Sequence, residues 1–324
     1  MRHPIILSPL VLALALARSS PAPLPPVPDT AIAISATPVM LDSAHPGRRD
    51  VGALHFLGAW ALRSDEPAFG GLSGAVMGRN EIITVSDSGA FVRIGLTGGK
   101  PDGRGHIAPL PQGCGTAGYK ADRDAEAMTG DPATGRIWVS LERRNAICRL
   151  RGLATTEAEI FPPVIAKWPG TTGGEALLRL PDGHFLMWSE SQAKATGLSP
   201  LLRFDRDPTL PGVTVESMRW RAPSGFRPVD ATRLPDGRIL VLHRRFSFIG
   251  WFRSMLSVVD PKTLGHGGIV ESREIARIDG SLIRDNYEGL AVDRENGRTI
   301  VWIISDDNFY FLQRTLLLKF AFDG

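Results

Sequence analysis

One pattern occurs five times along the chain: a strand start rich in Gly or Ala that carries one acidic residue, then a turn, then a second strand that ends in another acid. The copies begin roughly every 50 to 58 residues and span residues 72–89, 124–144, 173–191, 228–245 and 286–308. A period of this length is typical of propellers and other repeat arrays. Each copy is therefore expected to form one blade.

The turn inside each copy sets the register of its two strands, because it contains Gly or Asn, which tolerate positive φ in tight hairpins. Seven residues after Asn80, Gly135, Gly183 and Gly237 stand Asp87, Glu142, Glu190 and Arg244, and nine residues after Gly297 stands Asp306. Side chains alternate between the faces of a strand, so the equal parity places these residues on equivalent faces. The acids at the strand starts are Glu126, Glu175, Asp230 and Glu288. Both sets are expected to converge on the central channel that the innermost strands of a propeller line.

Composition supports a single all-β unit. Of the 324 residues, 43% are hydrophobic and 22% are charged, as in an ordinary globular protein. No long amphipathic helix is evident, which argues against an α/β fold. We expect one all-β domain over residues 39–324, a single β-propeller with about five to six four-stranded blades. Residues 52–62 are expected to pair with residues 315–322 and so to close the ring, which removes exposed sheet edges.

The N-terminus has the features of an export signal. Arg2 and His3 precede an apolar stretch from Ile5 to Ala17, which ends in an A-x-A-like cleavage site. This stretch is too short to span a bilayer, which takes about 20 residues. Residues 1–17 are expected to be a signal peptide cleaved after Ala17, and residues 18–38 a Pro-rich spacer. We expect a secreted protein, or a periplasmic one in an organism with two membranes, with no stable membrane span.

The cysteines and the charge balance limit the available functions. Cys114 and Cys148 either form a disulfide, which export permits, or remain unpaired on adjacent blades. No C-x-x-C pair supports thiol exchange or structural zinc. The formal charge of +3 includes no basic run of the kind that binds nucleic acid. We expect a monomer that accepts a small anionic or ester substrate and does not bind nucleic acid.

The acids of the repeats are the candidate metal ligands. Carboxylates that converge on a narrow channel repel one another unless a cation, an arginine or a shared proton compensates. Calcium suits such a cluster because it accepts about six to eight oxygen ligands in flexible geometry. The candidate ligands are Asp87, Glu126, Glu142, Glu175, Glu190, Asp230, Glu288 and Asp306. Alternatively, each acid caps backbone N–H groups and pairs with an arginine, and so only joins blades.

Two copies depart from the pattern. Ser73 stands where the other copies have an acid, and the fourth copy ends in His243 and Arg244. With Glu175, these residues are the candidates for catalysis: Arg244 would hold an anionic group, His243 would be a general base, and Ser73 a nucleophile. A lone His at a strand end is more often a hydrogen-bonded structural residue. Residues 71–75 approximate a G-x-S-x-G elbow, a motif that requires a strand-turn-helix context.

The segment that follows, residues 246–252, is rich in aromatic side chains. It either covers or lines the mouth of the channel, touches a membrane, or packs between blades. The sequence contains no Walker A loop, dinucleotide fingerprint or H-E-x-x-H motif.

Six motifs together resemble the phytase-like propeller family, also called "esterase-like activity of phytase". They are FLGAWAL, FGGLSGAV with VSDSG, DAEAM with LER, GGEALL, LHRRFS, and NYEGLAV with SDDN. The resemblance covers about residues 39–322. It implies an exported β-propeller related to phosphoester or ester hydrolases, with Ca²⁺ as the expected metal. Family members commonly have Leu-Glu-Arg where this chain has Leu242, His243 and Arg244, so one acid is lost.

Three functions follow from these features. The first is metal-assisted hydrolysis of a phosphate or carboxylic ester in the acidic channel, with Ca²⁺ on Glu126, Glu175, Glu288 and Asp306 and the anionic group on Arg244. The second is a non-catalytic periplasmic propeller that binds a ligand or a partner. The third is a lactonase-like hydrolase, which would share the acidic channel and the divalent ion.

Overall fold

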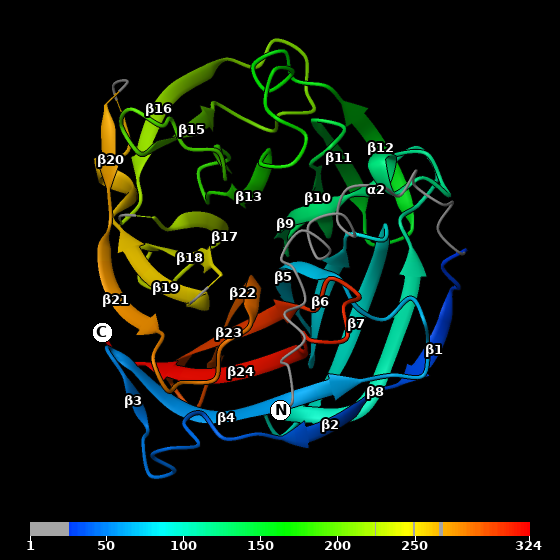
Figure 1. The fold of residues 1–324 in the computed structure, drawn as a ribbon. Coiled ribbons are helices and arrows are strands. Elements are labelled where there is room, and N and C mark those ends of the chain that lie inside the picture. The colour runs from blue at the N-terminus through cyan, green and yellow to red at the C-terminus, as the bar shows by residue number, and fades with distance from the viewer. Residues whose placement is uncertain (1–25, 224, 249, 266–267) are drawn as a thin grey trace, which may run out of the picture.

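Five β-sheets are arranged around a central axis, and each places its innermost strand beside that axis (Figure 1). The computed structural model describes residues 26–324 apart from residues 224, 249 and 266–267. The expected all-β propeller is confirmed, and it has five blades. The predicted signal peptide, residues 1–17, lies outside the described residues.

The blades are numbered in chain order, with strands given from the axis outwards. Blade 1 contains β5 (Leu72–Gly78), β6 (Glu81–Ser86), β7 (Ala90–Thr97) and β8 (Lys100–Pro109), with β1 (Thr30–Ala33) at its edge. Blade 2 contains β9 (Ala125–Asp131), β10 (Arg136–Leu141), β11 (Ala146–Arg151) and β12 (Thr155–Ile160). Blade 3 contains β13 (Gly174–Arg179), β14 (Phe185–Ser189), β15 (Leu198–Phe204) and β16 (Val215–Arg221), with β20 (Ile269–Glu271) parallel to β16.

The last two blades and the short helices complete the molecule. Blade 4 contains β17 (Arg227–Arg233), β18 (Ile239–Ser247), β19 (Trp251–Val259) and β21 (Arg273–Ile278). Blade 5 contains β22 (Asn286–Glu295), β23 (Arg298–Asp306), β24 (Thr315–Phe322), β4 (Leu54–Arg63) and β2 (Ser35–Pro38), and β3 (Asp50–Val51) pairs with β4. The helices among the described residues are α2 (Lys120–Arg123) and the 3₁₀ turn η1 (Pro261–Thr263). No helix among the described residues has both the length and the apolar character needed to cross a membrane.

Blade 5 closes the ring with strands from both ends of the chain. β4 pairs antiparallel with β24, from Leu62 opposite Thr315 to Leu54 opposite Phe322. This confirms the expected pairing of residues 52–62 with residues 315–322. Part of the expected spacer also takes part, because β1 and β2 pair with β8 and β4.

An apolar cluster fills each interface between adjacent blades. Between blades 3 and 4, Trp188 and Trp220 pack edge to face with ring centroids 5.8 Å apart. Between blades 5 and 1, Trp60 and Trp302 lie 6.2 Å apart. Because both faces of most strands are buried between blades, the blades hold the strand ends at the axis in fixed positions.

Cys114 and Cys148 form a disulfide, which decides between the two alternatives left open by the sequence. Their Cα atoms lie 5.7 Å apart. Cys148 belongs to β11, whereas Cys114 lies in the connection between β8 and α2. The bond therefore fastens the segment that carries α2 to the third strand of blade 2.

Every innermost strand has a β-bulge near its start. The pairing register skips one residue in each: Gly74, Glu126, Glu175, Val229 and Glu288. A bulged residue has no partner on the neighbouring strand, and the strand bends there, which changes the direction of the side chain. In three of the five blades the residue re-aimed in this way is a glutamate.

Candidate functional site

An acidic pocket of about 180 Å³ lies at the end of the axis where the innermost strands begin. All five blades contribute to it, and its lining residues are Asp87, Lys120, Asp124, Glu126, Glu142, Arg143, Thr171, Glu175, Glu190, Arg244, Glu288, Asp306 and Asn308. Eight of these side chains are carboxyls and three are cationic, which leaves a formal charge of −5 when all are ionised. We call this the acidic pocket.

The structure brings seven of the eight predicted metal ligands into the acidic pocket. They are Asp87, Glu126, Glu142, Glu175, Glu190, Glu288 and Asp306. The parity argument therefore places the ends of the second strands correctly. Their role as ligands stays a prediction.

Ser73 lies between the acids of two neighbouring blades. Its Oγ donates to Glu126 Oε2 at 2.9 Å and is 3.2 Å from Glu288 Oε2. The side chain belongs to strand β5 and is only 1% exposed. The G-x-S-x-G segment therefore lies in a strand of a hairpin, without the following helix that a nucleophile elbow requires.

Asp230 does not reach the acidic pocket, which corrects its inclusion among the ligands. Pro228 pairs with His243, so the residue equivalent to Glu126 in blade 4 is the bulged Val229. Asp230 comes one residue later and accepts backbone N–H groups of Leu290 at 2.6 Å and Ala231 at 2.8 Å, with a longer contact to Ala75. Burial raises its pKa, although these donors act in the opposite direction. Asp230 therefore links blades 4, 5 and 1 through backbone hydrogen bonds.

His243 is also absent from the acidic pocket, which corrects the expectation that it faces the channel. It is fully buried between blades 3 and 4, where it stacks on Trp220 with an interplanar angle of 16°. Trp220 Nε1 donates to His243 Nε2 at 3.2 Å, which requires that nitrogen to be unprotonated. Burial lowers the pKa of His243 to about 4. His243 is therefore a hydrogen-bonded structural residue, the alternative considered from the sequence, and we do not assign it the role of general base.

Arg244, the next residue, does enter the acidic pocket. Its guanidinium donates to Glu190 Oε1 at 2.7 Å and to Asn286 Oδ1 at 2.6 Å, and it also pairs with Glu288. Burial lowers the pKa of Arg244, but the neighbouring carboxylates of Glu190 and Glu175 outweigh this effect and raise it. Arg244 thus supplies positive charge where blade 4 lacks an acid.

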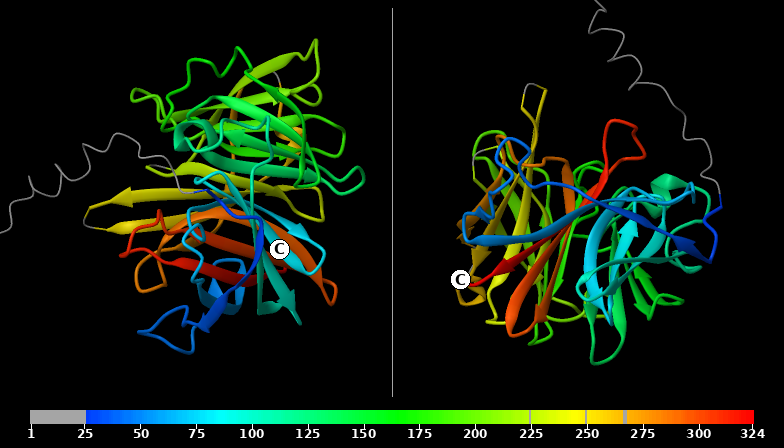
Figure 2. Two further views of the ribbon diagram at one scale, coloured as in Figure 1. Left: turned by 90° about the vertical axis from the view of Figure 1, so that its right-hand side faces the viewer. Right: turned by 90° about the horizontal axis from the view of Figure 1, so that it is seen from below.

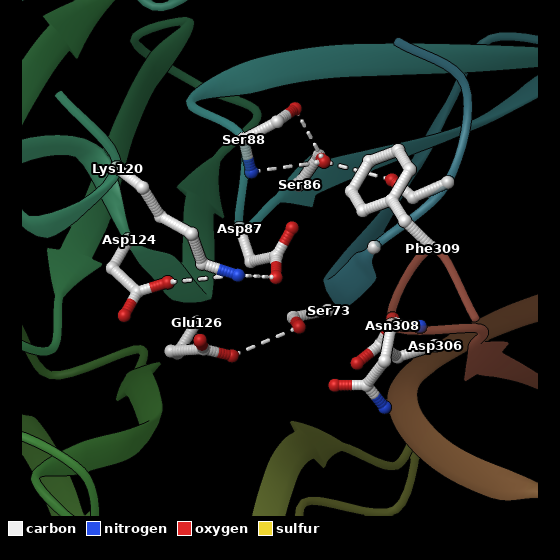
Figure 3. A network of polar contacts seen from close by, with 12 residues as sticks. Ser73, Ser86, Asp87, Ser88, Lys120, Asp124, Glu126, Asp306, Asn308 and Phe309 are labelled. Atoms are coloured by element: carbon white, nitrogen blue, oxygen red, sulfur yellow. Dashed lines mark hydrogen bonds and ion pairs between the residues drawn. The ribbon is translucent and has the colours of Figure 1, made fainter. Parts of the chain in front are cut away.

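The site residues predicted from the sequence do not include five residues of the pocket: Lys120, Asp124, Arg143, Thr171 and Asn308. Lys120 extends from α2 and its Nζ contacts Asp87 and lies 4.0 Å from Asp124 (Figure 3). Asp124 also accepts from Arg143 Nε at 2.6 Å. The sequence carried a signal for Asp124, because it alternates with Glu126 at the start of the strand. It carried none for Lys120, which lies in a connection with no periodic pattern.

The carboxyls of the pocket differ from isolated ones. Burial, followed by repulsion from neighbouring carboxyls, raises the pKa of Glu126, Glu175 and Asp306 well above the usual range. The pKa values of Asp87 and Asp124 are also raised, chiefly by burial, although Lys120 opposes this. The cationic side chains therefore compensate only part of the charge, and a bound cation would lower the remaining repulsion.

The residues present fit a hard metal ion. Asp124, Glu126 and Glu142 each offer one oxygen, and these oxygens lie within 4.8 Å of one another. Asp87 Oδ1 is buried and has no hydrogen-bond partner among the described residues. A donor set made only of oxygens suits Ca²⁺ better than softer metals.

Two aromatic loops project from the face of the propeller that holds the acidic pocket (Figure 2). In the β18–β19 turn, Phe246 packs against Trp251 and Phe252, while Phe248 is 92% exposed. In the β23–β24 loop, Phe311 is 84% exposed. The described residues of the segment 246–252 therefore belong to a projecting hairpin, in which Phe248 is exposed and Phe252 is buried.

Comparison with known proteins identifies the family. The sequence profile of the phytase-like family, described as esterase-like activity of phytase, matches residues 67–309. The chain belongs to this family. The match covers the innermost strands of all five blades and so confirms the resemblance carried by the repeated motifs. No curated protein sequence matches this phytase-like chain significantly.

Solved structures resemble the phytase-like protein at low sequence identity. The α-L-arabinofuranosidase of Podospora anserina, in complex with cellotriose, is 10% identical with a TM-score of 0.50, over 90% of this chain and 98% of that one. The glutaminyl cyclase of Myxococcus xanthus is 12% identical with a TM-score of 0.47, over 93% of this chain and all of that one. At such identities the likeness concerns the propeller fold alone.

Proposed function

We propose that this phytase-like protein is a metal-assisted hydrolase that cleaves a phosphate or carboxylic ester of a small substrate in the acidic pocket. The observation that carries the proposal is the convergence of eight carboxyls and three cations, from five blades, on one pocket. If the acids only joined the blades, each would be paired with a cation or an N–H group, which would lower its pKa. Burial and mutual repulsion instead raise the pKa values of Glu126, Glu175 and Asp306. Membership of the phytase-like family supports the same class of reaction.

The proposed metal is Ca²⁺, held by Asp124, Glu126 and Glu142, with Asp87 close by. When bound, it would polarise the ester oxygen and orient a water molecule. Glu126, Glu142 and Asp87 are among the ligands predicted from the sequence, whereas Asp124 is new.

The chain's own residues would supply proton transfer and anion binding. Burial and the neighbouring Glu190 raise the pKa of Glu175, so its carboxyl would keep a proton to higher pH than an ordinary glutamate and could act as a general acid or base. Arg244 already lies between Glu190 and Glu288, and an anionic substrate group would compete with these carboxylates for its guanidinium. Ser73 would keep Glu126 and Glu288 at a fixed separation through its hydrogen bonds.

Turnover of p-nitrophenyl phosphate and p-nitrophenyl butyrate, with Ca²⁺ and with EDTA, tests the proposal. We expect turnover of at least one ester that EDTA abolishes, and a loss of about 100-fold or more in kcat/KM for Glu126→Gln and Glu175→Gln. The matched control is Glu274→Gln, which lies on the surface beside Arg277 and should keep full activity. Absence of turnover on both esters, together with no Ca²⁺ binding in calorimetry, would refute the proposal.

Binding without catalysis is the second candidate, and one observation favours it. Lys120 forms an ion pair with Asp87, and Arg244 forms ion pairs with Glu190 and Glu288. These pairs neutralise part of the acidic charge without a metal ion, and a pocket that only binds a ligand would need no metal. In that case Glu175→Gln would leave ligand binding intact while no substrate is processed. A lactone panel in the same assay separates a lactonase-like hydrolase from an esterase.

We also propose that the protein is exported. The disulfide supports this, since such bonds persist in oxidising compartments. Mass spectrometry of the mature protein should give an N-terminus after Ala17, and an intact Met1 in the cytoplasmic fraction would contradict export.

A further inference from the structure

A second pocket, of about 960 Å³, lies at the opposite end of the axis, where the innermost strands turn into the second strands. Residues from all five blades line it, as they do the acidic pocket. Its charge is reversed, because it contains Arg79, Arg136, Arg179 and Arg233 but only one acid, Asp131. We call it the basic funnel.

The basic funnel is separate from the acidic pocket. Glu175 and Arg179 lie on the same strand, β13, four residues apart, which is roughly 13 Å along a strand. Between the two levels the innermost strands approach closely: a Cβ on Gly74 would come within 2.9 Å of the Ala127 Cα, and one on Gly289 within 3.4 Å of the Ala75 Cβ. The two pockets have no lining residue in common.

The arginines of the funnel are only partly neutralised. Arg179 pairs with Asp131 at 3.2 Å, and Arg136 pairs with Glu157 at 2.8 Å. Asp131 also accepts from Ala133 N and Thr134 Oγ1, so its oxygens are shared with the turn. Arg79 and Arg233 have no ion pair among the described residues, and both are exposed. Positive charge at this end is therefore available to a ligand.

The funnel is also amphipathic. Four residues after the bulged residue of each innermost strand stand Gly78, Gly130, Arg179, Arg233 and Val292, and all of them line the funnel together with Met77 of blade 1. The two arginines come from the adjacent blades 3 and 4, whereas Met77 and Val292 come from the adjacent blades 1 and 5. Arg179 and Arg233 thus stand across the axis from Met77 and Val292, while Arg79 lies in the turn between β5 and β6.

We propose that the basic funnel binds a small anionic amphiphile, a molecule with one carboxylate or phosphate group and a short apolar chain. The guanidinium groups of Arg179 and Arg233 would bind the anionic group, since arginine forms bidentate contacts with both kinds of oxyanion. Met77 and Val292 would contact the apolar chain. A volume of about 960 Å³ is within the range of small-molecule sites. This site is independent of the hydrolysis proposed for the acidic pocket.

Calorimetry with three probes of equal chain length tests the charge requirement: octanoate, octyl phosphate and octyltrimethylammonium. Binding of octanoate, octyl phosphate or both, with no binding of the cation, is expected, and the tighter of the two anions identifies the preferred headgroup. Affinity should fall as salt rises, since the arginines are partly exposed. Equal affinity for the cationic probe, or no binding of either anion, would overturn the proposal.

Variants locate the site. The double variant Arg179→Ala/Arg233→Ala should weaken the anion by at least tenfold, whereas Arg206→Ala, a surface arginine paired with Asp205, should change nothing. Met77→Asp provides a second variant on the opposite wall, and it should weaken the anion as well by repulsion. Glu126→Gln should leave the affinity unchanged, which separates this site from the acidic pocket. Unchanged affinity in both funnel variants, with native circular dichroism, would show that the anion binds elsewhere.

Discussion

His243 and Arg244 are neighbours on β18 but lie in opposite surroundings. Because side chains alternate along a strand, Arg244 points to the axis and its acids, while His243 points into the apolar interface with blade 3. A shift of one residue along the strand therefore separates the Arg244 guanidinium, which lies in the acidic pocket, from the His243 imidazole, which is neutral in the core.

The buried His243 is expected to make stability depend on pH. Its pKa is about 4 in the folded chain and 6.5 as a reference, so between these values the unfolded chain binds a proton that the folded chain does not. The contribution of His243 should therefore become unfavourable to folding as pH drops from about 6.5 to 4, by about 3 kcal/mol at most. Urea unfolding at pH 4.5, 5.5 and 7 should show a weaker dependence for His243→Gln. The half-exposed His55→Gln serves as control, and an unchanged slope in the first variant would contradict the assignment.

Asp230 shows why a residue-by-residue reading of the sequence partly fails. The hairpin turns give the parity of the second strands, so Asp87, Glu142, Glu190, Arg244 and Asp306 could be placed from the sequence. The bulges could not, because they depend on how an inner strand packs against its neighbours. In blade 4 the bulge falls on Val229, and Asp230 next to it bonds backbone groups of three blades instead.

At the scale of the element, the five bulges let the innermost strands approach one another while their glutamates turn into the pocket. Gly74 is the bulged residue of β5, and it has a φ of 22°. A Cβ at this position would lie 2.8 Å from Met128 N and 2.9 Å from Ala127 Cα, both on the neighbouring β9. Backbone atoms cannot rotate away, so this close approach requires glycine.

Replacement of Gly74 by Ala should therefore destabilise the propeller by roughly 1–3 kcal/mol. Chemical denaturation measures the change. The matched control is Gly130→Ala on β9, where the nearest atom to a new Cβ is 3.7 Å away, and its effect should stay within about 0.5 kcal/mol. Equal effects of the two substitutions would show that blade contact at Gly74 is not the constraint.

At the scale of the whole molecule, stability depends on ring closure by β24. All eight residues of this strand are buried, between β23 on one side and β4 on the other. Burial of a large apolar side chain contributes about 1.5–3 kcal/mol, so the strand supplies on the order of 10 kcal/mol, comparable with the net stability of a domain. The sequence could indicate this closure, since residues 52–62 and 315–322 both have strand character without a partner nearby in the chain.

A chain without residues 315–324 is therefore expected to lose cooperative thermal unfolding, followed by circular dichroism. Removal of β1 instead, which is mostly exposed and pairs only with the outer edge of blade 1, should lower the midpoint by a few degrees at most. A truncated chain that keeps a sharp transition near the original midpoint would show that the ring does not need this closure.

The pairing of β4 with β24 also orders events during biosynthesis. The ribosome makes β4 before any complete blade and makes β24 after the other strands of the ring, so β4 can pair only with β2 and β3 until β24 emerges. Blades 1 to 4 contain only strands from one continuous stretch, apart from edge strands, and can form as they emerge. Until β24 is available the propeller is thus an open arc, and it becomes a ring only when β24 joins β23 to β4.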